Sequence, residues 1–210
     1  VCSSDLDMKG AGAVMWTVAQ AIDDCGVALQ GDLHLHSVVG EEMMEHEIGT
    51  TAVLKAGNRT DAAIVTEPSS FPAALTINPV APSALVFTIS IVGRATHSAN
   101  RPLAVRPGGP GDAVGVNAVE RVIPILESLQ ELERQWGLEM RHPAFPPGWF
   151  TIGPNVLHAD AGTPLPSSFA DRARIEYVAW HSPSIAPEAI KQAICTQVHH
   201  ARSEEHTSEL

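Results

Sequence analysis

The sequence predicts an α/β protein made of two parts that are joined by a hinge. In the first part, helix-like and strand-like apolar segments alternate, as in an open α/β sheet. Residues 76–82 contain two prolines and no amphipathic pattern, which indicates a hinge. Beyond the hinge the predicted order is β-α-β-β-α, one strand short of a ferredoxin-like α+β domain.

The first part is predicted to contain two helices and two strands. Residues 8–24 are rich in apolar residues on more than one face, which favours a largely buried helix ending before Gly26. Valines and leucines over residues 27–39 indicate a strand. A second helix is expected over residues 45–56, and a short strand over residues 62–66. In such a sheet, functional side chains gather at the carboxyl ends of the strands.

The second part begins with the clearest strand of the sequence. Over residues 84–92, large apolar side chains alternate with small and polar ones, as in a strand buried on one face. The other elements expected here are a Gly- and Pro-rich loop (residues 102–111), the longest helix (115–136), two strands (149–152 and 174–180) and a last helix (187–198).

The two ends of the chain share one coding sequence. Residues 202–207 can be back-translated into a DNA string whose reverse complement encodes residues 1–6. One DNA sequence read in two orientations resembles a sequencing adapter, and added segments of this kind are set aside before a fold is considered. We therefore expect residues 1–6 and 202–210 to be adapter translation, and the chain between them to be a fragment.

Adjacent carboxylates follow the apolar residues of the first predicted strand, in the run Val-Val-Gly-Glu-Glu. Neighbouring side chains leave a strand in opposite directions, so Glu42 can bind a metal while Glu41 acts as a general base. Asp7 and Glu67 are the other expected oxygen ligands, and Pro68 holds Glu67 in extended geometry. These ligands alone suit magnesium, calcium or manganese. The alternative for the Glu pair is an ordinary helix start.

Four motifs, DMKG, GEE, TEP and GRATHS, occur in an order that resembles the zinc aminoacyl-hydrolase family of acetylornithine deacetylase, succinyl-diaminopimelate desuccinylase and carboxypeptidase G. The resemblance implies a site with two zinc ions, in which cobalt or manganese is also possible. Asp7 would bridge the ions, and Glu42 and Glu67 would each bind one. Glu41 would be the general acid and base, and His97 would help to stabilise the tetrahedral intermediate.

The resemblance also implies a domain plan and an activity. Residues 7–80 would be part of a catalytic α/β sheet domain, and residues 81–201 an incomplete, inserted ferredoxin-like lid. The strand over residues 84–92 would give the lid an edge for homodimerisation. The activity would be cleavage of the amide bond of an N-acyl amino acid or small peptide. The family's two histidine ligands belong to motifs that this sequence lacks, so a non-catalytic dimerisation or binding fragment, or a degenerate member without turnover, remains an alternative.

The composition of the chain restricts its expected partners and cellular location. The chain has 24 acidic against 13 basic residues and a net charge of −11, which argues against nucleic acid or an anionic membrane as a partner. The sequence contains no uninterrupted apolar run long enough to predict a membrane-spanning segment. Cys25 and Cys195, which remain once Cys2 is set aside, are too few for a disulfide framework and favour the cytoplasm. His34 and His36 are expected to be surface or packing residues.

Overall fold

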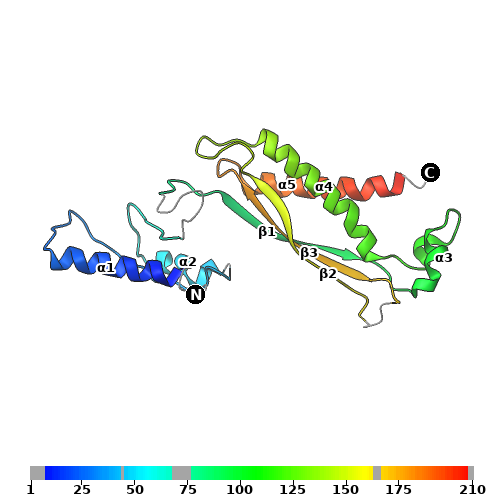
Figure 1. Ribbon diagram of the computed structural model, residues 1–210, viewed down its shortest axis with the longest axis horizontal. Coiled ribbons are helices and arrows are strands. Elements are labelled where there is room, and N and C mark those ends of the chain that lie inside the picture. Colours follow the sequence, from blue (N-terminus) through cyan, green and yellow to red (C-terminus); the bar gives the residue numbers. More distant parts are fainter. Residues whose placement is uncertain (1–7, 44, 68–76, 163–166, 208–210) are drawn as a thin grey trace. The chain divides into compact units, whose positions relative to one another are not determined.

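The computed structural model describes residues 8–43, 45–67, 77–162 and 167–207, with side chains up to Ala201 in the last helix. The chain separates into two units, Val1–Ile77 and Asn78–Leu210 (Figure 1). The boundary falls inside residues 76–82, where the hinge is expected. Each unit is described by itself. No helix in the described part of the chain has both the length and the apolar character needed to cross a bilayer.

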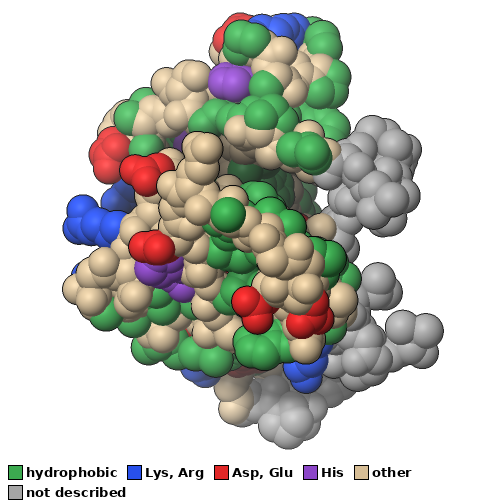
Figure 2. All heavy atoms as spheres, turned by 90° about the vertical axis from the view of Figure 1, so that its left-hand side faces the viewer, with side chains coloured by type: hydrophobic (Ala, Val, Ile, Leu, Met, Phe, Trp, Pro, Cys, Tyr) green, Lys and Arg blue, Asp and Glu red, His purple; other side chains and the backbone are tan. Residues whose placement is uncertain are grey.

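The first unit consists of short helical elements and extended chain. Its helices are α1 (Gly10–Asp24) and α2 (Thr50–Lys55), with a 3-10 turn, η2 (His46–Ile48), before α2. The helix predicted over residues 8–24 is thus confirmed. Its predicted burial is wrong, because α1 has no buried side chain and Trp16 is 68% exposed. Many hydrophobic side chains also reach the surface on the face drawn in Figure 2.

Neither strand predicted for the first unit forms in its described residues. Residues 27–39 and 62–66 have no regular secondary structure and belong to no ladder of the described chain. A strand is stabilised by cross-strand pairs and by burial of one face, more than by the preference of its own residues. Leu29 and Leu33 remain about half exposed, so both stabilising terms are missing. The helix predicted over residues 45–56 is divided into η2 and α2, with Gly49 between them.

The second unit is built on an antiparallel sheet of three strands. The strands β1 (Ser83–Val92), β2 (Thr151–Asp160) and β3 (Arg172–His181) lie in the order β1-β3-β2. The pairing of β1 with β3 is unbroken, whereas β2 shifts its register between Pro154 and Val156. All three predicted strands are confirmed, and β2 extends eight residues beyond the predicted end.

Two long helices, α4 (Ala118–Glu139) and α5 (Pro187–Thr207), lie on one face of the sheet (Figure 1). Helix α5 continues past the predicted end at residue 198. The predicted loop at residues 102–111 is partly wrong, because it starts within a short helix, α3 (Arg101–Val105). Pro102 is tolerated there because the first turn of a helix lacks acceptors for its N–H groups.

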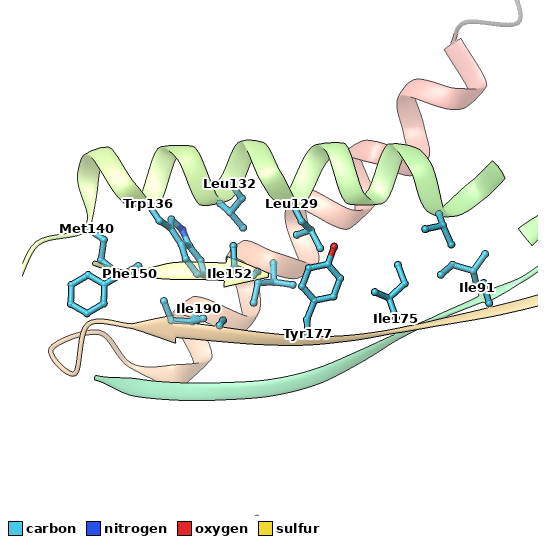
Figure 3. Close-up of a cluster of buried hydrophobic side chains, with 14 of the residues drawn as sticks. Ile91, Leu129, Leu132, Trp136, Met140, Phe150, Ile152, Ile175, Tyr177 and Ile190 are labelled. Carbon is cyan, nitrogen blue, oxygen red and sulfur yellow. The ribbon is translucent and has the colours of Figure 1, made fainter. Parts of the chain in front are cut away.

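Side chains from α4, α5 and all three strands form one hydrophobic core. Figure 3 shows the α4 side chains directed at those of the sheet. The labelled members of this core are Ile91, Leu129, Leu132, Trp136, Met140, Phe150, Ile152, Ile175, Tyr177 and Ile190. With the short α3 set aside, the order β1-α4-β2-β3-α5 is the predicted one, and the chain has the mixed α/β fold expected from its sequence.

Candidate functional site

The Glu41-Glu42 pair lies in a tight turn that depends on a glycine. The Glu45 N–H donates to the Gly40 carbonyl oxygen at 2.8 Å, closing the turn around the two carboxylates. Gly40 has φ +84°, and a Cβ added there would lie 2.8 Å from the Glu45 oxygen. Only glycine fits both requirements. Both Glu side chains are exposed.

A second glycine brings the start of α2 against the residues before this turn. A Cβ on Gly49 would lie 2.1 Å from the Val39 carbonyl oxygen, so the two backbones approach too closely for any side chain. An ion pair of 2.6 Å between Lys55 and Glu47 links α2 to η2. The local position of the Glu pair is therefore set by the backbone contacts of Gly40 with Glu45 and of Gly49 with Val39.

The three predicted carboxylate ligands are only partly covered by the described residues. Asp7 lies outside the described residues. Glu42 and Glu67 are described, and each takes part in an interaction within the chain. The described residues contain no group of three or more His, Cys, Asp or Glu side chains that could hold a metal ion. Because Asp7 is outside that part of the chain, the three expected ligands stay a prediction. His34 and His36 contact each other edge to face, with ring centroids 6.1 Å apart.

His97 has a defined orientation in the loop that follows β1. Its Nδ1 accepts a hydrogen bond of 3.1 Å from the Ala99 N–H, which caps the short 3-10 helix η3 (Ser98–Asn100). An imidazole nitrogen that accepts a hydrogen bond is unprotonated, so the neutral ring carries its proton on Nε2. The side chain is exposed. His97 thus presents a hydrogen-bond donor to whatever lies in front of the loop.

The His97 loop is held on both sides by backbone hydrogen bonds. The Ser98 N–H donates to the Ser167 oxygen at 2.6 Å, and the Phe169 N–H donates to the Thr96 oxygen at 2.9 Å. These bonds tie the loop to the residues that lead into β3. The loop is therefore part of the folded unit.

Two positions around this loop require glycine because neighbouring atoms leave no room for a Cβ. A Cβ on Gly93 would lie 2.4 Å from the Val116 oxygen, and a Cβ on Gly115 would lie 2.4 Å from the Thr96 side chain. Asn100 also donates to the Thr96 hydroxyl at 3.1 Å. Asn100 carries no motif signal in the sequence, and only its polar type three residues after His97 could have suggested a turn-forming role.

Glu41 belongs to the first unit and His97 to the second. The structure defines the local geometry of each residue within its own unit. Burial, and secondarily the nearby Glu133 carboxylate, raise the pKa of Tyr177 in the core of the second unit to about 12.

Sequence comparison places the chain among known hydrolases. N-formyl-4-amino-5-aminomethyl-2-methylpyrimidine deformylase from Bacillus subtilis is 34% identical over 154 residues, which cover 72% of this chain and 34% of that protein. The protein of the same name from Halalkalibacterium halodurans is 30% identical over 191 residues, covering 90% and 42%. The chain thus spans less than half the length of these relatives.

Among solved structures, aminopeptidase PepT from Bacillus cereus is similar with a TM-score of 0.42 and 14% identity, over 91% of this chain and 42% of that one. The sequence model of Peptidase family M20/M25/M40 matches residues 5–209, almost the whole chain. The narrower acetylornithine deacetylase branch is not singled out by these matches. This chain belongs to Peptidase family M20/M25/M40.

Proposed function

We propose that this chain is part of a metal-dependent hydrolase that cleaves the amide bond of a small N-acylated amine. The observation that carries the proposal is the family match over residues 5–209, together with two relatives named as deformylases. A deformylase hydrolyses the amide of an N-formyl amine, which is the reaction type expected from the sequence motifs. The N-acyl amino acid or peptide remains the wider substrate class, and the N-formyl amine is the first compound to test.

Glu41 is proposed as the group that moves protons. An exposed carboxylate held by a glycine turn is free to take a proton from an attacking water and to return it to the leaving amine. A positioned general base of this kind contributes on the order of a hundred- to ten-thousand-fold in rate. The fixed turn limits the directions in which the carboxylate can point, which supports this role over that of a freely solvated side chain.

His97 is proposed as the donor that stabilises the oxyanion formed when water adds to the amide carbonyl. Its Nδ1 is engaged by the Ala99 N–H, so Nε2–H is the available donor. A donor held in place before the reaction costs little reorganisation when the negative charge develops. The backbone bonds on both sides of the loop supply that rigidity.

The proposed metal is zinc, as two ions with cobalt or manganese as substitutes, and the proposed ligands are Asp7, Glu42 and Glu67. Since Asp7 lies outside the described residues, this proposal rests on the motif order and on family membership. It applies to a longer protein in which histidine ligands complete the site.

We further infer a homodimer formed through the second unit, and a cytoplasmic location. Among the described residues, no further strand pairs with the outer edge of β1 or of β2, and an isologous edge contact is a common route to a dimer. Cys25 and Cys195 are exposed free thiols, which suits a reducing compartment.

The test uses the full-length protein recovered from the gene that contains this sequence. Turnover of an N-formyl aminomethylpyrimidine, N-acetyl-ornithine and N-succinyl-diaminopimelate is compared before and after chelation of metal. Glu41→Gln is expected to lose turnover and keep its metal, whereas Glu42→Gln and Glu67→Gln are expected to lose metal. Equal metal loss in Glu41→Gln and Glu42→Gln would show that the roles are wrongly assigned. Absence of amide hydrolysis on all substrates in the metal-loaded protein would reject the function.

A further inference from the structure

His97 lies on one leg of a closed loop in the second unit. The two legs meet where Arg94 and Val116 form an antiparallel bridge, with N–H to oxygen distances of 2.8 and 3.0 Å in the two directions. The Arg94 guanidinium also donates to the Ala113 oxygen on the returning leg at 3.1 Å. Because these bonds join the two legs, the turn that carries His97 begins from a fixed base.

Thr96, the residue before His97, is held both by its backbone and by its side chain. Its carbonyl oxygen accepts a hydrogen bond of 2.9 Å from the Phe169 N–H. Its methyl group lies against Gly115, where an added Cβ would be 2.4 Å from the Thr96 Cγ2. A β-branched side chain has few χ1 rotamers, so these contacts restrict the direction in which the Thr96 hydroxyl can point.

Asn100, the last residue of η3, connects back across His97 at two points. Its backbone N–H donates to the His97 carbonyl oxygen at 2.8 Å, and its side-chain Nδ2 donates to the Thr96 hydroxyl oxygen at 3.1 Å. The side-chain bond is partly buried, whereas the His97 ring is exposed. A hydrogen bond shielded from water is electrostatically stronger than an exposed one. We call the bond between these two side chains the Thr96–Asn100 clasp.

The clasp encloses a turn that is too short to be stable by itself. The helix η3 is a single 3-10 turn, and such short helices depend on outside contacts. The bond from the Ala99 N–H to the His97 Nδ1 closes the same turn but is exposed to water. If the turn opens, Nδ1 loses its donor, and the neutral ring can carry its proton on either nitrogen. Holding the turn closed therefore selects the ring form with the proton on Nε2.

We propose that Thr96 and Asn100 are positioning residues for His97, and that they keep its ring in the form whose Nε2–H is available as a donor. The inference rests on the proposed function, in which this N–H stabilises the oxyanion. A donor that already has its reacting form and direction needs no rearrangement when negative charge develops on the substrate oxygen. Thr96 and Asn100 act on the reaction through His97 and do not touch the substrate.

The competing explanation is that Thr96 matters only because its methyl group packs against Gly115. Thr96→Val keeps that methyl and replaces the hydroxyl by a second one, whereas Thr96→Ser keeps the hydroxyl and removes the methyl. The clasp predicts an effect of valine, and packing predicts an effect of serine. Asn100→Ala removes the same bond from its other side. The double variant of Thr96→Val and Asn100→Ala should therefore be affected no more than either single variant.

The first test uses the complete chain and does not depend on turnover. Long-range proton–nitrogen NMR spectra at mildly alkaline pH, where imidazoles are neutral, report which nitrogen carries the proton, and the His97 signals are those lost in His97→Gln. The parent and Thr96→Ser are expected to show mainly the Nε2–H form, and Thr96→Val and Asn100→Ala a mixture of both forms. Hydrogen exchange of the Ala99 amide should quicken about fivefold in the latter two, which is equivalent to about 1 kcal/mol. Thr88→Val, the same change at an exposed position of β1, is the matched control and should alter neither measurement.

Two outcomes of this test would overturn the proposal. The first is a parent-like ring form and a parent-like Ala99 exchange in Thr96→Val and Asn100→Ala. The second is an equal change in Thr96→Ser, which would assign the effect to packing. Exchange of the β3 amides monitors the fold of the unit, and Asn100→Ala decides the matter if Thr96→Val loosens it.

The second test measures turnover in the full-length protein. Thr96→Val and Asn100→Ala are expected to lower kcat by about tenfold, less than the roughly 10²–10³ lost when an oxyanion donor is removed outright, with a smaller change in KM. A parent-like kcat in both variants, with His97→Ala inactive, would overturn the inference. Full turnover in His97→Ala would instead reject the proposed role of His97. The NMR spectra distinguish these two failures because they require no activity.

Discussion

The single tyrosine of the chain offers a direct test of how the core of the second unit is built. Tyr177 is 1% exposed and stacks on Phe87 with a centroid distance of 5.2 Å and an angle of 10°. Its buried hydroxyl has no hydrogen-bond partner in the described structure. Tyr177→Phe keeps the ring and the stacking contact, and removes only this hydroxyl.

The expected effect at neutral pH is an increase in stability. Burying a hydroxyl without a partner costs about 1–3 kcal/mol in proteins, so the free energy of unfolding of Tyr177→Phe should rise by about 1 kcal/mol. At alkaline pH the two proteins should differ further. Burial raises the pKa of Tyr177 from 10.0 to about 12, so its neutral form is favoured in the folded state. The stabilisation of the folded state that results from this pKa difference is complete below pH 10. Roughly 2–3 kcal/mol of the free energy of unfolding is lost as the pH rises to 12.

The assay is hydrogen exchange of the β3 amides, which reports the second unit alone, measured for both proteins from neutral to alkaline pH. The absorbance of tyrosinate follows the ionisation directly, since no other tyrosine is present. The parent protein should lose stability between pH 10 and 12 more steeply than the variant. A variant less stable than the parent by 1 kcal/mol or more would mean that the hydroxyl has a partner, and an ordinary tyrosine pKa would refute the reasoning on burial.

Three further predictions concern backbone contacts and activity. Gly93→Ala should lower the free energy of unfolding of the second unit by about 1–3 kcal/mol in denaturant, because the added Cβ would collide with the Val116 oxygen. Gly137→Ala in α4 is the control: its Cβ would meet nothing within 4 Å, and the free energy of unfolding should rise by about 0.5–1 kcal/mol. Equal effects of the two substitutions would contradict the contact at Gly93. This chain alone should show no amide hydrolysis, since the sequence lacks the motifs that would supply the two histidine ligands expected from the resemblance; turnover of N-acetyl-ornithine with tight stoichiometric zinc in calorimetry would contradict this. In the proposed full-length homodimer, mixing Glu41→Gln with His97→Ala should restore partial activity if His97 acts across the interface; verified heterodimers without recovery would exclude action between subunits.

The fold of the second unit could be predicted because its strands and helices have their packing partners within the same sequence. The alternation over residues 84–92 describes a half-buried strand, and β3 and the helices are present to bury it. Strand β2 was underestimated because Gly153 and Pro154 are strand breakers by type. Pro154 is accommodated because β2 is an edge strand whose register shifts at that point, so its missing N–H interrupts little of the ladder.

In the first unit, one feature is determined by residues close in sequence, and another depends on pairing within a sheet. The turn at Gly40 is specified by residues a few positions apart, because it needs a positive φ and one backbone hydrogen bond. The motif that identifies Glu41 is therefore formed without any strand pairing. The predicted strand over residues 27–39 depends on neighbours, and in their absence its leucines and the apolar faces of α1 stay exposed. Metal ligands at the ends of separate strands require the sheet to bring them together, whereas the turn at Glu41 and Glu42 forms from residues that are close in sequence.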